Sequence, residues 1–106
     1  MKSDSIILGI DPGTTIMGFG LIKVMDNHLE VVRLHELILK KFGDHYLKLE
    51  KIFNQTIGII EEYYPDEIAI EAPFYGKNVQ SMLKLGRAQG VAMAAGLSRK
   101  IPITES

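Results

Sequence analysis

Two acidic residues each follow a short apolar run and stand just before a proline. Asp11 follows the run 6–10 and is followed at once by Pro12, whereas Glu71 closes the run 67–71 two residues before Pro73. Proline cannot continue a strand, so both acids stand where a strand meets a loop. If the two strands are parallel neighbours, both carboxylates emerge at one edge of the sheet, where ligands bind in open α/β sheets.

This pair of carboxylates predicts a metal site. Two carboxylates held close together repel, so they must share a cation or one must hold a proton. The chain has no cysteine, and its three histidines lack the spacing of metal ligands, so oxygen ligands for Mg²⁺ or Mn²⁺ are favoured. Metals held by carboxylates hydrolyse phosphodiesters, and we predict that Asp11 and Glu71 are catalytic metal ligands. The alternatives are a structural turn at Asp11 and a lysine partner for Glu71.

The segment after the second acid has the composition of a nucleic-acid contact. Residues 1–71 hold 7 basic and 12 acidic residues, whereas residues 72–106 hold 5 basic residues and one acid, so the net charge changes from −5 to +4. Aromatic residues beside cations at a helix N-terminus can stack on bases and bind phosphate. The alternatives are a hydrophobic staple and a solvated helix face. The predicted DNA contacts are Phe74, Tyr75, Lys77, Asn78, Lys84 and Arg87.

The elements that would position these residues follow from apolar periodicity. Three apolar segments joined by short turns predict an antiparallel meander, and a helix with apolar residues three and four apart follows it. A strand then completes a right-handed crossover onto the same sheet, which makes the fold α/β with a mixed sheet and flanking helices. The predicted strands are 6–10, 18–24, 28–39, 67–71 and 101–104, and the predicted helices are 46–63 and 78–97.

A stripe of small residues runs along the second predicted helix. Gly86, Gly90 and Ala94 are spaced one per turn on one face. Glycine inside a helix costs about 1 kcal/mol relative to alanine, so the stripe indicates a close backbone approach. A neighbouring helix or a second subunit would supply that contact.

Bulk composition is that of one globular domain. The 106 residues are 46% hydrophobic and 24% charged. No apolar run approaches the roughly 20 residues that a membrane span needs, and the N-terminal apolar run is too short for a signal peptide. We therefore expect a cytoplasmic protein that has no membrane contact.

Several motifs together resemble the RuvC family of bacterial Holliday-junction resolvases. They are Gly9-Ile10-Asp11-Pro12-Gly13, Gly18-Phe19-Gly20, Ala69-Ile70-Glu71 with Phe74, Lys77-Asn78, and the run from Leu83 to Ala92. The resemblance covers essentially the whole chain, from Ile6 to Glu105.

The resemblance implies a ribonuclease-H-like fold and a homodimer that cuts four-way DNA junctions with Mg²⁺ or Mn²⁺. It also implies work alongside the branch-migration proteins RuvA and RuvB. Asp11 and Glu71 match the family's first two catalytic acids, Phe74 matches an aromatic residue inserted at the junction, and Gly86 and Gly90 match the dimer helix.

The family's other two catalytic acids are expected on a C-terminal helix beyond Ser106. Residues 1–106 are then expected to be a single nuclease domain truncated before that helix. Such a chain by itself would cleave slowly or not at all.

Three other functions fit parts of the pattern. The Asp-x-Gly-Thr-Thr turn also resembles the phosphate turn of actin-like ATPases and sugar kinases, although those proteins are several times longer. RuvC-like pre-ribosomal RNA nucleases share the Asp-x-Gly strand. A DNA-binding or dimerisation module without catalysis is the non-enzymatic alternative.

Overall fold

The computed structural model describes residues 4–72 and 78–106. Within these ranges the predicted elements are present, and none of their ends moves by more than two residues. The strands are β1 (Ser5–Asp11), β2 (Ile16–Met25), β3 (His28–Ile38), β4 (Glu67–Ile70) and β5 (Ile103–Glu105), and the helices are α1 (His45–Tyr63) and α2 (Val79–Ser98).

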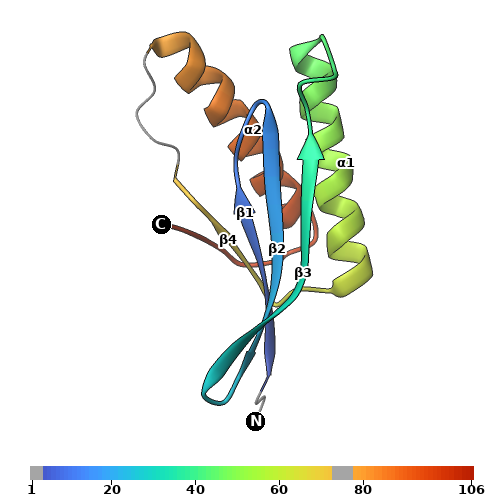
Figure 1. Cartoon of the computed structure of the whole chain (residues 1–106), viewed down its shortest axis with the longest axis vertical. Helices are drawn as coiled ribbons and strands as arrows, with labels where there is room; N and C mark the ends of the chain where they lie inside the picture. The colour runs from blue at the N-terminus through green and yellow to red at the C-terminus, as the bar shows by residue number, and fades with distance from the viewer. Residues whose placement is uncertain (1–3, 73–77) are drawn as a thin grey trace.

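All five strands form one mixed sheet in the order β3-β2-β1-β4-β5. β1, β2 and β3 pair antiparallel, whereas β4 pairs parallel with both β1 and β5 (Figure 1). The predicted meander and crossover are therefore confirmed. Backbone bonds between Ile6 and Asp66 fix where the parallel pairing starts, because the Asp66 amide donates to the Ile6 carbonyl oxygen at 2.7 Å. The Asp66 carboxylate in turn accepts from the Ile6 amide at 2.8 Å.

Both helices pack on one face of the sheet, and the core lies between them and the strands (Figure 1). Successive strand residues point to opposite faces, so alternate residues of β1, β2 and β4 enter this core. The buried strand residues are Leu8, Ile10, Met17, Phe19, Leu21, Ile68 and Ile70. They pack with Ile52, Ile59, Ile60, Ala88 and Ala92 of the helices.

α2 lies close against the sheet at Gly96. A Cβ added there would lie 2.6 Å from Cδ1 of Ile68, so a glycine lets the helix backbone settle against β4. At Gly86 and Gly90 an added Cβ would meet no described atom within 4 Å. The predicted stripe therefore makes no close approach to another described part of this chain.

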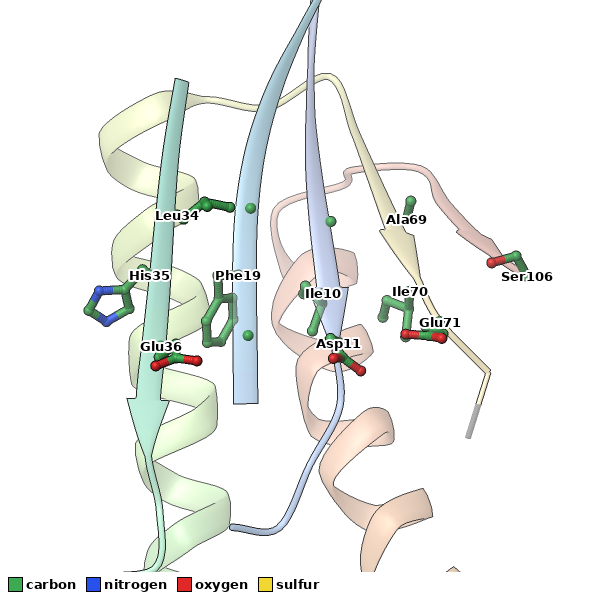
Figure 2. A pocket seen from close by; sticks show the side chains of 13 residues that line it. Ile10, Asp11, Phe19, Leu34, His35, Glu36, Ala69, Ile70, Glu71 and Ser106 are labelled. Carbon is green, nitrogen blue, oxygen red and sulfur yellow. The ribbon is translucent and has the colours of Figure 1, made fainter. Parts of the chain in front are cut away.

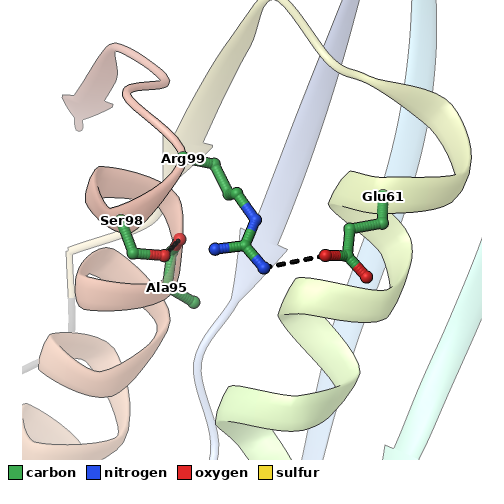
Figure 3. Close-up of polar contacts among 4 residues, drawn as sticks. All are labelled: Glu61, Ala95, Ser98 and Arg99. Atoms are coloured by element: carbon green, nitrogen blue, oxygen red, sulfur yellow. Dashed lines mark hydrogen bonds and ion pairs between the residues drawn. The ribbon is translucent and has the colours of Figure 1, made fainter.

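Polar side chains cap the N-terminal ends of both helices, and an ion pair links their C-terminal ends. Asp44 and Asn78 accept hydrogen bonds from the amides of Leu47 and Ser81, which satisfies free N–H groups at the helix starts. At the C-terminal ends, the Arg99 guanidinium donates to the Glu61 carboxylate at 2.7 Å (Figure 3). Both side chains are about half exposed, so this pair contributes about 1 kcal/mol or less.

No helix in the described ranges is long and apolar enough to cross a membrane.

Candidate metal and DNA site

The two predicted carboxylates lie beside each other at the ends of neighbouring strands. β1 and β4 pair in parallel up to Ile10 and Ile70, and the Glu71 amide continues the ladder by donating to the Ile10 carbonyl oxygen at 3.1 Å. Asp11 and Glu71 therefore occupy matching positions on adjacent strands. Figure 2 shows their carboxylates side by side at this edge of the sheet. Both residues are exposed.

The carboxylates stand on the face of the sheet opposite the helices. Ile10 and Ile70 point into the core, so the next residue on each strand points the other way. We call this the open face. It holds a depression of about 910 Å³ whose lining includes Asp11, Glu71 and three glycines, Gly9, Gly18 and Gly20. Because glycine has no side chain, the strand backbones there stay accessible to a ligand.

A third carboxylate, Glu36, lies in the same row across the sheet. Asp11 pairs with Gly18 on β2, and Gly18 pairs with Glu36 on β3. Residues directly opposite each other across strands share a face, so Glu36 lines the same open-face depression, two strands from Asp11 (Figure 2). Sequence reasoning missed Glu36, because its face depends on a register shift in β3.

That register shift is a β-bulge opposite Leu21 and Ile22. Ile22 pairs with Val31, but Leu21 pairs with Arg33, so Val32 is an extra residue in β3. If β3 had no bulge, continuing the pairing one residue at a time from Met25 and His28 at the turn would place His35 opposite Gly18. A one-residue shift moves every later side chain to the other face of the sheet. The bulge thus turns Glu36 to the open face.

The donor set suits a divalent cation in part. Two neighbouring carboxylates supply hard oxygen ligands of the kind that Mg²⁺ and Mn²⁺ bind. The described ranges contain no group of three or more acidic, histidine or cysteine side chains that could hold a metal. Asp11 and Glu71 would therefore fill only part of a coordination sphere.

Basic residues gather where α2 passes the start of α1. Lys84 and Arg87 are exposed on α2, and His45 begins α1. The pKa of His45 is lowered by burial of its ring and by the positive charges of Arg87, Lys84 and Lys48, with Asp44 acting in the opposite direction. Nε2 of His45 is buried and has no hydrogen-bond partner among the described residues. The ring therefore sits within a positive field to which both helices contribute.

Of the other predicted DNA contacts, the structure describes only Asn78. Asn78 caps α2, and its side-chain oxygen accepts from the Ser81 amide at 2.8 Å. This structural role occupies one of its oxygen lone pairs and leaves its amide group free to donate. Phe74, Tyr75 and Lys77 lie outside the described residues.

The predicted dimer stripe lies on an exposed face of α2. Gly86, Gly90 and Ala94 are all exposed. Large apolar side chains accompany them, with Val79 72%, Leu83 51% and Leu97 61% exposed. Exposed apolar area beside small residues is typical of a surface that packs against another protein.

Comparison with known proteins gives consistent results. The family model described as crossover junction endodeoxyribonuclease RuvC matches residues 7–106. Curated proteins of that name from Christiangramia forsetii and Bacteroides fragilis are 70% and 66% identical to this chain. They match over 99% and 96% of it, and over 55% and 54% of their own lengths. The chain thus spans about half the length of these relatives.

A solved structure shares the fold. T. thermophilus RuvC in complex with Holliday junction substrate superposes with a TM-score of 0.86 at 18% identity, covering 96% of this chain and 64% of that one. The expected ribonuclease-H-like α/β fold is confirmed. With a family model matched over nearly its whole length, the chain belongs to the RuvC family of crossover junction endodeoxyribonucleases.

Proposed function

We propose that the protein is a metal-dependent endonuclease that resolves four-way (Holliday) DNA junctions during recombination and repair. The observation that carries this proposal is the placement of Asp11 and Glu71 side by side on the open face. The name of the curated relatives, crossover junction endodeoxyribonuclease RuvC, supports it. So does the junction substrate bound to the T. thermophilus protein.

Asp11 and Glu71 would hold Mg²⁺ or Mn²⁺ at this edge. A bound cation stabilises charge on the phosphodiester and makes a water molecule a better nucleophile. The role of the chain's own residues is to hold the ligand oxygens in place and to keep the open face clear. The glycines at positions 9, 18 and 20 leave room for a DNA backbone to approach the two carboxylates.

DNA would extend from the carboxylates toward the basic residues of α2. Lys84 and Arg87 are the described candidates for phosphate contacts, and Asn78 would contribute its side-chain amide. We extend the proposal to Phe74, Tyr75 and Lys77 on sequence grounds. Contacts to phosphates orient the protein on the junction without reading its sequence.

The active form would be a homodimer joined through the exposed face of α2, at Gly86, Gly90 and Ala94. A symmetric pair of sites fits a substrate with four arms that is cut on two strands. We also propose, from the family resemblance, that RuvA and RuvB are its partners and that it acts in the cytoplasm. Residues 1–106 would form one nuclease domain of such a protein.

The cleavage test uses a full-length chimera, in which residues 1–106 replace the matching part of the C. forsetii relative. With a synthetic four-way junction, we expect symmetric nicking that depends on Mg²⁺ or Mn²⁺. Asp11→Asn should slow nicking at least about 100-fold, or about 2.7 kcal/mol of transition-state stabilisation, with junction affinity unchanged. Wild-type rates in Asp11→Asn would contradict the metal assignment. The 106-residue chain, tested in parallel, is expected to cleave slowly or not at all.

The proposed dimer interface is tested by adding a methyl group to exposed glycines, two on α2 and one on α1. Gly86→Ala and Gly90→Ala should each stabilise the helix by about 1 kcal/mol but weaken self-association, because the added methyl groups separate the two helices. Gly58→Ala on α1 is the matched control, since an added Cβ there also meets no atom within 4 Å. Sedimentation analysis should show weaker self-association for the two α2 variants and unchanged self-association for Gly58→Ala. Equal association in all three variants would contradict the proposed interface.

A further inference from the structure

The loop after Asp11 is held by a small number of contacts. It runs from residue 12 to residue 15, and its turn is tight, because a Cβ on Gly13 would collide with the carbonyl oxygen of Ile16. The carbonyl oxygen of Thr15 accepts from the amides of Leu39 and Lys40 at 2.8 and 3.1 Å. These backbone bonds anchor the end of the loop that is farther from Asp11.

A lysine side chain anchors the middle of the same loop. Nζ of Lys48 donates to the carbonyl oxygen of Thr14 at 3.2 Å, although the two residues are 34 positions apart in the chain. Lys48 lies in the first turn of α1, where its own amide donates to the Asp44 carbonyl oxygen at 3.1 Å. The ammonium group therefore reaches the loop from a capped, regular helix end.

An ion pair does not account for the position of the Lys48 ammonium group. The ion pairs between described residues are Lys23 with Asp4 and Arg99 with Glu61, so Lys48 has no carboxylate partner among them. Its surroundings are also positive, as the pKa of His45 shows by responding to Lys48, Lys84 and Arg87 together. Holding a long, flexible, charged side chain against a neutral carbonyl costs side-chain entropy. A stabilising ion pair does not explain the contact.

The Asp11 side chain, in contrast, has no such support. Within residues 4–72 and 78–106 its carboxylate makes no hydrogen bond or ion pair. It is the last residue of β1, directly before the loop (Figure 2). The direction of the carboxylate is thus set by the backbone on either side, and the loop is one of those sides.

We propose that Lys48 is a positioning residue for Asp11, which acts through the Thr14 carbonyl to fix the loop and so the angle between the Asp11 and Glu71 carboxylates. This inference rests on the proposed function, because it concerns the same metal ligands. It adds a residue of α1, on the helix side of the sheet, to a site that lies on the open face. Groups that orient metal ligands typically change metal affinity or activity about 10- to 100-fold when they are removed.

The test is the metal requirement of junction cleavage by the full-length chimera. Lys48→Met removes the donor and keeps most of the aliphatic stem. We expect the Mg²⁺ concentration for half-maximal cleavage to rise about 10-fold, whereas junction affinity measured without metal stays within about twofold. Lys48→Arg, which keeps a donor and the charge, should restore most of the metal affinity. If thermal denaturation shows that Lys48→Met does not fold, the metal requirement of Lys48→Gln is measured instead.

Two control lysines separate positioning from charge. Lys51→Met removes the same charge from α1, where Nζ lies 5.5 Å from the centroid of the Phe42 ring, and should leave the metal requirement unchanged. Lys84→Met should weaken junction binding and flatten its salt dependence without raising the metal requirement.

An unchanged metal requirement in Lys48→Met overturns the inference. So does a Lys48→Met variant with the behaviour expected of Lys84→Met, because Lys48 would then be a phosphate contact. The proposed function fails separately, if the wild-type chimera does not nick junctions or if Asp11→Asn nicks them normally.

Discussion

The two faces of the sheet are made by alternate residues of the same strands, yet they differ in almost every property. On the helix side, Leu8, Ile10 and Ile70 are at most 3% exposed. The residues that follow them, on the open side, are Gly9, Asp11 and Glu71. Because the pleat separates neighbouring side chains by the thickness of the sheet, stability and chemistry can be assigned to adjacent positions. A mutation should therefore affect one property or the other according to its face.

The largest expected effect is on stability and comes from the covered face. Ile70→Ala removes a side chain that is 1% exposed, and should lower the free energy of unfolding by about 2–5 kcal/mol. Glu71→Gln, one residue further on the open side, should change it by less than about 0.5 kcal/mol. Urea denaturation of both variants measures the difference. Equal destabilisation would break the division between the faces.

An intermediate effect is expected on activity and comes from the open face. A Cβ at Gly18 would lie at an ordinary contact distance, 3.6 Å, from Cβ of Asp11, so the fold should accept a side chain there. Gly18→Leu would then fill the depression between Asp11 and Glu36. We expect cleavage by the chimera to fall about 10-fold or more, because misplacing reacting groups by about 1 Å can cost 100-fold. Unfolding free energy should change by less than about 1 kcal/mol.

Gly43→Leu is the control for this substitution. Gly43 lies outside the sheet, and an added Cβ there meets no described atom within 4 Å. It should leave cleavage unchanged. Normal cleavage by Gly18→Leu would show that the open depression is not used by the substrate.

The smallest expected effect concerns Glu36. It lies two strands from Asp11, or about 10 Å at the usual spacing of neighbouring strands. A charge at about 10 Å in water attracts a monovalent cation by roughly 0.4 kcal/mol and a divalent one by about twice that. Glu36→Gln should therefore raise the metal requirement of cleavage by about two- to fourfold. A larger rise, of 100-fold, would mean that Glu36 contacts the metal directly.

Much of this arrangement is predictable from the sequence, because it depends on local patterns. The apolar runs ending at Asp11 and Glu71 and the strand–helix–strand order predict the sheet and the edge where the two acids meet. Glu36 is different, since its face depends on the bulge at Val32, and no residue pattern in β3 marks that extra residue. Lys48 was also missed, because its contact with Thr14 joins positions 34 residues apart through a backbone carbonyl.

The parallel pairing of β1 with β4 has a further consequence, for linkage between ligand binding and local unfolding. Asp11 and Glu71 are neighbours only while these strands are paired, and the pairing covers four residue pairs and the bond from the Glu71 amide to Ile10. A cation that needs both carboxylates binds the paired state and stabilises it by mass action. Opening of β4 should then become rarer as the cation is added. The hydrogen-exchange rate of the Glu71 amide would thus report occupancy of the site without any DNA present.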